Sequence, residues 1–123
     1  MPAAGAHTLP RPERLRGRTS ITALMRSGKY VSMSPLRLCY HAREDDDPSR
    51  IVVSVPKRLF KRAVKRNLLK RRIRESYRLQ KHLLPTGYDL LWIYTSSEVQ
   101  PFAPIFEATG CLLATVAGDG KVQ

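Results

Sequence analysis

The sequence predicts an α/β (α+β) fold: a single compact domain in which a mixed, mainly antiparallel sheet packs against helices. With 123 residues, the chain has room for one hydrophobic core but not for two. Hydrophobic residues make up 42% of it, which is enough to form that core. Apolar strand-like segments stand before and after one long helical segment, an order typical of helices packed on a mixed sheet. The expected order is α-β-β(-β)-α-β-α, with one strand left optional.

The predicted domain covers residues 13–117, between a flexible arm at 1–12 and a flexible tail at 118–123. The arm contains three prolines, one glycine and three alanines, and it has little to bury. It also lacks the apolar stretch of a secretory signal. No apolar run approaches the ~20 residues that span a bilayer. We therefore expect a cytoplasmic protein that does not bind membranes.

The domain is expected to open with a short helix and two strands. The Thr-Ser pair at 19–20 can cap a helix, and Gly28 is a natural stop for it. Residues 36–41 alternate in polarity, with Tyr40 on the same side as Leu36 and Leu38, as in a half-buried strand. Residues 51–55 are β-branched and apolar on both faces, as in a central strand. We expect these two strands to form an antiparallel hairpin.

A long amphipathic helix is predicted to follow over residues 63–84, which contain neither glycine nor proline. One stripe of that helix is apolar and should dock on the sheet; its members are Leu69, Ile73, Tyr77 and Leu84. Residues 89–94 read as a second buried strand, reached by a crossover into the same sheet. A last helix is expected over 101–117, with an apolar face of Ile105, Phe106, Leu112, Leu113 and Val116.

The positive charge is concentrated in one segment of the chain. Of 22 basic residues, twelve lie between Lys57 and Lys81 together with one acid, Glu75, so this segment carries +11 of the net +12. A concentrated basic segment indicates a binding surface for a polyanion.

The basic side chains of the predicted helix lie on the face opposite its apolar stripe. Asn67, Arg71, Arg74 and Arg78 are spaced four, three and four residues apart, with Arg66 and Lys70 beside them. Guanidinium groups bind phosphate in a bidentate manner and stack on bases. Further cations precede the helix or lie in its first turn, where the positive end of the helix dipole also attracts phosphate; these are Lys57, Arg58, Lys61, Arg62 and Lys65.

Three other interpretations of the basic helix explain less. A solvated charged face normally mixes signs, whereas one acid stands here against twelve bases. A nuclear-localisation signal would not also need a docking stripe. A helix lying on an anionic membrane needs a large exposed apolar face with aromatic residues, whereas the core needs this stripe.

Residues 63–75 (AVKRNLLKRRIRE) resemble the signature of the bacterial ribonuclease P protein component. The resemblance extends upstream through residues 53–58 and downstream through 76–78. It is weaker from residue 14 to Gly28 and in the strand that ends at Tyr40, and the last third fits in pattern only.

The resemblance implies a left-handed βαβ crossover, against the general rule. It implies that the catalytic RNA of ribonuclease P binds the basic helix at Lys65, Arg66, Asn67, Lys70, Arg71, Arg74 and Arg78. It also implies a cleft for the 5′ leader of precursor tRNA, lined by Ile21, Tyr40, Val53, Lys57, Arg58 and Arg62. No obligate protein partner is expected.

Two positions depart from the family pattern. Leu68 stands where a second arginine is common, which puts one phosphate contact in question; Leu68 would instead cover an apolar neighbour. Ile21 and Met25 stand where the first helix often carries aromatic residues. Leader binding is therefore expected to depend more on Tyr40 or to be weaker.

The sequence contains no pattern typical of a catalytic site in the protein itself. The three histidines, His7, His41 and His82, are scattered, and we expect them on the surface. The acids of the turn at 44–47 are expected to be solvated. Cys39 and Cys111 are expected to be reduced core residues. In the family, the RNA holds the active site and its Mg²⁺ ions, and the protein binds no metal.

Two alternative functions use the same basic helix. A ribosomal-type structural RNA-binding protein would have no role in processing, and reconstituted cleavage activity would separate the two. A small DNA-binding protein would need base-reading residues and usually a dimer, for which the sequence shows no element.

Overall fold

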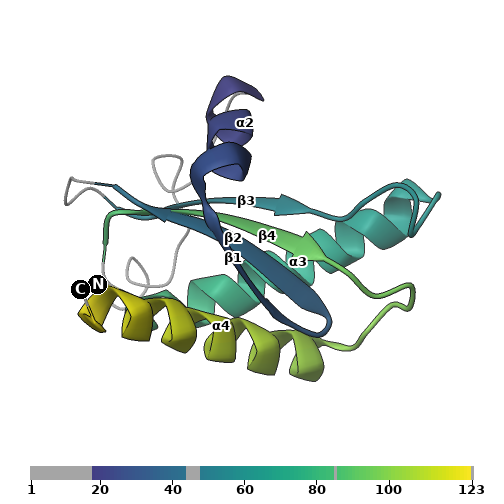
Figure 1. The fold of residues 1–123 in the computed structure, drawn as a ribbon. Coiled ribbons are helices and arrows are strands. Elements are labelled where there is room, and N and C mark those ends of the chain that lie inside the picture. Colours follow the sequence, from purple (N-terminus) through teal and green to yellow (C-terminus); the bar gives the residue numbers. More distant parts are fainter. Residues whose placement is uncertain (1–17, 44–47, 85, 123) are drawn as a thin grey trace, which may run out of the picture.

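A computed structural model describes residues 18–43, 48–84 and 86–122 of the chain (Figure 1). The predicted arm at residues 1–12 and the acids at 44–47 lie outside the described residues. The elements are α2 (Arg18–Ser27), β1 (Lys29–Met33), β2 (Leu36–Ala42), β3 (Arg50–Ser54), α3 (Ala63–Gln80), the 3-10 helix η2 (Lys81–Leu83), β4 (Tyr88–Tyr94) and α4 (Phe102–Val122). The predicted fold class is confirmed, with the optional strand present.

The four strands form one sheet in the order β1-β2-β4-β3. β1 pairs with β2 and β2 with β4 in antiparallel fashion, whereas β3 pairs with β4 in parallel. The predicted hairpin between residues 36–41 and 51–55 is therefore wrong, because β4 lies between these two strands. β2 instead forms its hairpin with β1, whose residues were not assigned to a strand from the sequence.

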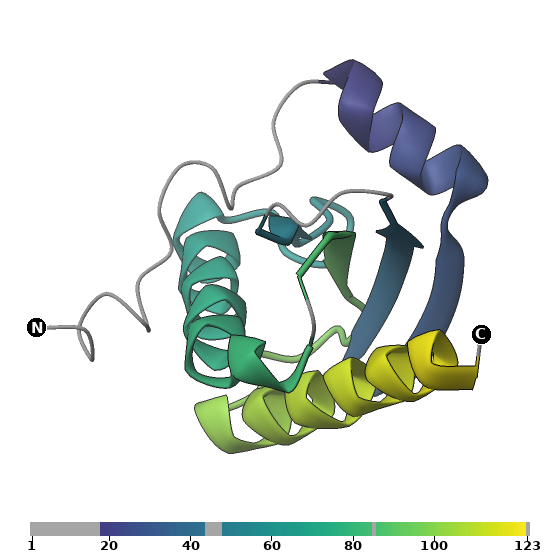
Figure 2. The same ribbon diagram turned by 90° about the vertical axis from the view of Figure 1, so that its left-hand side faces the viewer.

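β3, α3 and β4 form the predicted crossover between parallel strands. In Figure 2, β3 and β4 run away from the reader, and the path from β3 to α3 at the left and back across to β4 turns counterclockwise. This is the left-handed sense that the family resemblance implies. It places α3 under the β3 side of the sheet, beside α4 (Figure 2).

The main core lies between the sheet and the two helices α3 and α4 (Figure 2). Trp92 and Tyr94 from β4 are fully buried there, and the ring of Tyr77 from α3 lies 6.1 Å from that of Trp92. All four members of the predicted helix stripe are buried, as is the α4 face except for Phe106, which is half-buried. The stripe docks as predicted, although the regular helix ends at Gln80 and Leu84 follows η2.

Of the elements that the structure describes, α2 is the one that covers the opposite face of the sheet (Figure 2). Leu24 of α2 packs on Cys39 and Leu91 in a small second cluster. Gly28 ends α2 as predicted, and its N–H donates to the carbonyl oxygen of Leu24 at 2.8 Å. A Cβ atom at Gly28 would lie 2.6 Å from that oxygen and 2.7 Å from the Sγ of Cys39, so the helix end can approach the sheet only at glycine.

One carboxylate joins three strand ends. Asp89 of β4 accepts hydrogen bonds from Arg43, just after β2, and from Arg50 of β3. The side chain of Asp89 is 13% exposed, and its two arginine partners compensate for the burial of its charge. The charge of this acid is therefore already neutralised and does not oppose the cations of α3.

The C-terminal part of the chain differs from prediction in two places. α4 continues to Val122, so the helix includes most of the predicted tail at 118–123; Gly118 weakens a helix without ending it. Cys111 is exposed on α4, and only Cys39 is a core residue; both are unpaired thiols. Among the described residues, no helix is long and apolar enough to cross a membrane.

Candidate nucleic-acid interface

α3 presents two chemically different faces. Leu69 and Ile73 are fully buried against the sheet, while Asn67, Arg71 and Arg74 are exposed on the other side of the helix. Lys65 is also exposed in the first turn. Within the described ranges, no carboxylate pairs with Lys65, Arg71 or Arg74. The predicted separation of a docking stripe from a cationic face is therefore present, and these side chains are available to phosphate.

Three arginines of α3 make contacts within the protein instead. Arg66 donates to the carbonyl oxygens of Phe60 at 2.7 Å and Lys61 at 2.8 Å. Arg72 donates to the carbonyl oxygen of Gln100, before α4. Arg78 forms a two-bond ion pair with Glu75, which lowers the pKa of that carboxyl. Arg66 and Arg78, both predicted RNA contacts, thus have part of their donor capacity occupied.

The basic connection at residues 57–62 is anchored to the domain around Phe60. Phe60 is buried, with its ring 5.9 Å from that of Tyr94, while Lys57, Arg58, Lys61 and Arg62 are exposed. The hydrogen bonds from Arg66 fix the same loop from the helix side. No side chain caps the start of α3 at Arg62, so its first N–H groups add to the positive potential there.

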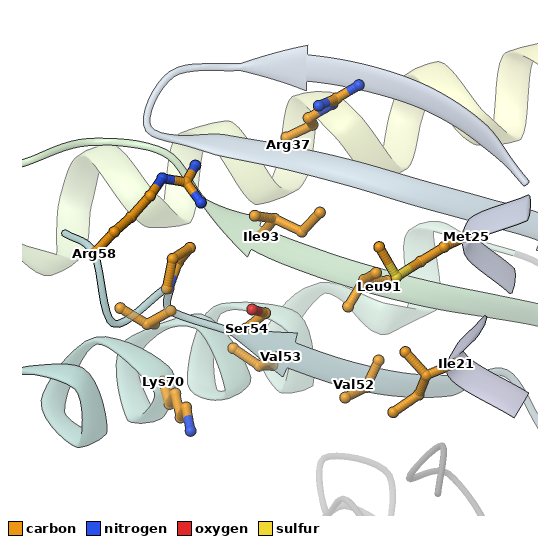
Figure 3. Close-up of a pocket in the computed structure, with 12 residues that line it drawn as sticks. Ile21, Met25, Arg37, Val52, Val53, Ser54, Arg58, Lys70, Leu91 and Ile93 are labelled. Atoms are coloured by element: carbon orange, nitrogen blue, oxygen red, sulfur yellow. The ribbon is translucent and has the colours of Figure 1, made fainter. Parts of the chain in front are cut away.

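A second feature lies on the open face of the sheet. A pocket of about 610 Å³ extends between α2 and the start of α3 (Figure 3). Its floor is the outer surface of β3 and β4, with Val52, Leu91 and Ile93. Ile21 and Met25 of α2 stand at one end. Arg37, Arg58 and Lys70 also line it, so the pocket combines an apolar floor with cationic edges.

The residues predicted to line a leader cleft divide into three groups. Ile21, Val53 and Arg58 do line the pocket. Lys57 and Arg62 are exposed on the adjoining connection but are not among its lining residues. The prediction that Tyr40 lines the cleft is wrong. Tyr40 is 7% exposed and lies in the main core, on the other face of the sheet. It alternates with Arg37 and Cys39 along β2, so its side chain points away from the pocket.

Several lining residues were not predicted from the sequence. The orientation of Arg37 could have been predicted from the alternation that places Leu36 and Leu38 in the core. The residue between them faces the other side of the sheet. Lys70 was assigned to the RNA-binding face, but it lines the pocket. Ile93 and Leu91 could not be assigned, since both faces of β4 are apolar in sequence.

The remaining histidines and cysteines in the described ranges form no metal-binding group. His41 and His82 are exposed, as predicted, and His7 lies outside the described residues. The described part of the chain contains no group of three His, Cys, Asp or Glu side chains that could hold a metal ion. Burial raises the pKa of the Cys39 thiol, which donates to the carbonyl oxygen of Leu24 and is therefore a structural group.

Comparison with known proteins places this geometry in one family. The family model Ribonuclease P matches residues 9–116. A ribonuclease P protein component from Porphyromonas gingivalis is 37% identical over 120 residues, covering 90% of this chain and 88% of the relative. Another, from Dictyoglomus turgidum, is 36% identical over 94 residues, covering 76% of this chain and 77% of the relative.

Solved structures agree with the sequence relatives. The RNase P protein from Thermotoga maritima superposes with a TM-score of 0.74 at 27% identity, covering 84% of this chain and 96% of that one. The RNase P protein from Staphylococcus aureus has the same fold, with a TM-score of 0.72 over 85% of this chain and 94% of that one. The chain that carries this basic helix and open-faced sheet is a member of the bacterial ribonuclease P protein family.

Proposed function

We propose that this chain is the protein subunit of ribonuclease P, binds the catalytic RNA through the exposed face of α3, and assists removal of the 5′ leader from precursor tRNA in the cytoplasm. The observation that carries the proposal is the row of exposed Arg71, Arg74 and Asn67 opposite a fully buried stripe on the same helix. Because the stripe fixes the helix on the sheet, the cations are presented in a fixed row. A polyanion with regularly spaced phosphates fits such a row.

The protein contributes charge and position, not a reacting group. No His, Cys, Asp or Glu lines the pocket, and the described residues contain no group of such side chains that could hold a metal ion. The RNA would hold the Mg²⁺ ions that activate water for hydrolysis of the phosphodiester. The cationic face of α3 would lower the repulsion between the catalytic RNA and its RNA substrate, both of which are polyanions.

The pocket on the open face is the proposed site for the single-stranded leader. Its apolar floor suits unpaired bases, and Arg58 and Lys70 at its edges suit the phosphates between them. It lies next to the basic connection and to α3, so one RNA strand could pass from the pocket to the helix start. Within the described residues, no aromatic ring lines it.

The proposal is tested by cleavage of precursor tRNA with the catalytic RNA of the same organism, with and without this protein. At low Mg²⁺ concentration, cleavage at the mature 5′ end should depend on the protein, because its cations replace part of the charge screening. A protein that leaves this rate unchanged, and that instead sediments with ribosomal subunits at high salt, would be a structural RNA binder without a processing role.

A further inference from the structure

Two side chains on neighbouring strands form a cation–π stack at the edge of the pocket. Arg37 of β2 pairs with Ser32 of β1, two residues from Tyr30 on the same face of the hairpin. The guanidinium carbon of Arg37 lies 4.3 Å from the centre of the Tyr30 ring, a cation–π contact. Tyr30 is 37% exposed, and Arg37 is exposed and lines the pocket.

The stack is fixed in place before any ligand binds. The Tyr30 hydroxyl donates to the carbonyl oxygen of Met25 at the end of α2, at 3.2 Å. The nearby Cys39 thiol and burial raise the pKa of Tyr30 further above physiological pH, so its hydroxyl keeps the proton that it donates to Met25. In the parts of the chain that the structure describes, no carboxylate pairs with Arg37. The ring therefore orients the guanidinium while the positive charge stays uncompensated.

A planar cation backed by an aromatic ring is a surface on which a nucleobase can stack. Arginine guanidinium planes and aromatic rings both stack on unpaired bases. The side chains that α2 contributes to the pocket, Ile21 and Met25, are apolar and offer contact without a π-face. The positive charge of Arg37 is also complementary to an RNA strand held at Arg58 and Lys70.

We infer that Arg37, held by Tyr30, stacks on one unpaired base of the RNA strand in the pocket and thereby positions the leader. The inference rests on the proposed function, because it assigns a residue to the leader site. The contact would require a base at one leader position without selecting its identity, since every base has a π-face. Arg37 is a positioning residue, and its neighbour Tyr30 acts through it.

The test uses holoenzyme reconstituted from the full chain and the catalytic RNA of the same organism. Single-turnover cleavage at increasing enzyme concentration gives the concentration for half-saturation by precursor tRNA. Precursors with a single abasic nucleotide, moved stepwise along the leader, locate the base that matters. The variants are Arg37→Ala, Arg37→Lys, which keeps the charge but not the plane, and Arg26→Ala, which removes an exposed α2 charge outside the pocket.

With wild-type protein, one abasic position should weaken binding at least about fivefold, the equivalent of about 1 kcal/mol for one stacked base. Arg37→Ala and Arg37→Lys should weaken binding of the intact precursor by a similar factor and abolish the penalty at that same position. Arg26→Ala should bind like the wild type and keep the penalty. Thermal melting of each variant verifies that the fold is retained.

The outcomes separate this inference from the proposed function. If wild-type protein favours precursor with a leader over mature tRNA, but Arg37→Lys keeps both the affinity and the abasic penalty, the stacking role is overturned and the leader site stands. The stacking role is likewise overturned if Arg37→Ala weakens binding equally for precursor and mature tRNA. If wild-type protein gives no preference for a leader at all, the leader site fails, and this inference fails with it.

Discussion

The two faces of the sheet are made by the same strands but are covered differently. On one face, α3 and α4 bury Trp92, Tyr94 and the apolar stripe of α3 in a continuous core. On the other, among the described residues, α2 packs on the cluster of Leu24, Cys39 and Leu91, and the adjoining surface of β3 and β4 forms the floor of the pocket. The first face therefore supplies most of the stability, whereas the second leaves apolar surface and cations for a ligand.

An isoleucine-to-alanine substitution on each face of the sheet tests this difference in stability most directly. Ile73→Ala removes a fully buried side chain of the core, and we expect a loss of about 2–5 kcal/mol in the free energy of unfolding. Ile93→Ala removes a half-buried side chain from the pocket floor. It should lower the free energy of unfolding by clearly less than Ile73→Ala. Urea unfolding measures both. Equal losses would show that the open face contributes to stability as the core does.

Gly28→Ala tests how firmly α2 is fixed on the open face. The new Cβ would meet a backbone oxygen and a buried sulfur at under 3 Å, so α2 must shift. We expect a loss of about 1–3 kcal/mol, the usual cost of overpacking. Gly118→Ala on α4 is the matched control, because a Cβ atom there would have no neighbour within 4 Å and alanine favours a helix. A Gly28→Ala protein as stable as the control would mean that α2 moves freely on the sheet.

Glu75→Gln is expected to have the smallest effect on stability and a measurable one on RNA binding. It removes the partly exposed ion pair with Arg78 and frees that guanidinium on the cationic face of α3. Affinity for the catalytic RNA at low salt should rise slightly. Lower affinity would indicate that the pair positions Arg78 for RNA.

The ion pair between Glu75 and Arg78 also predicts how the stability of the fold changes with pH. Arg78 lowers the pKa of Glu75 below its ordinary value of 4.5, so the carboxylate favours the folded state. This contribution is fully present above pH 4.5 and is lost as the pH falls through the lowered pKa. Acid unfolding of Glu75→Gln should therefore be less steep than that of the wild type in this range.

Local sequence patterns predicted most helices and strands, because their periodicities involve only residues that are close together in the chain. The stripe Leu69, Ile73 and Tyr77 located α3, and its burial followed. Strand pairing was not predictable in the same way. Residues 51–55 are apolar on both faces, which fits a neighbour on either side and says nothing of β4 lying between them and β2.

The same distinction applies to the site. The cationic face of α3 could be predicted from the sequence, because all of its residues belong to one helix. The pocket could not, because it combines residues of α2, β2, β3, β4, α3 and the connection before α3, which only the fold brings together. β1 was missed because its residues are mostly exposed and lack an apolar alternation. Tyr40 was misassigned although its own alternation with Leu36 and Leu38 placed it in the core.

The central claim is that the exposed face of α3 binds the phosphates of the catalytic RNA, and its most direct test is the salt dependence of that binding. For the double variant Arg71→Ala, Arg74→Ala, the slope of log affinity against log salt should become shallower by about 1 to 2, with the melting temperature unchanged. Arg78→Ala, which removes a cation already paired with Glu75, should change the slope less. A double variant that keeps the wild-type slope would contradict the account.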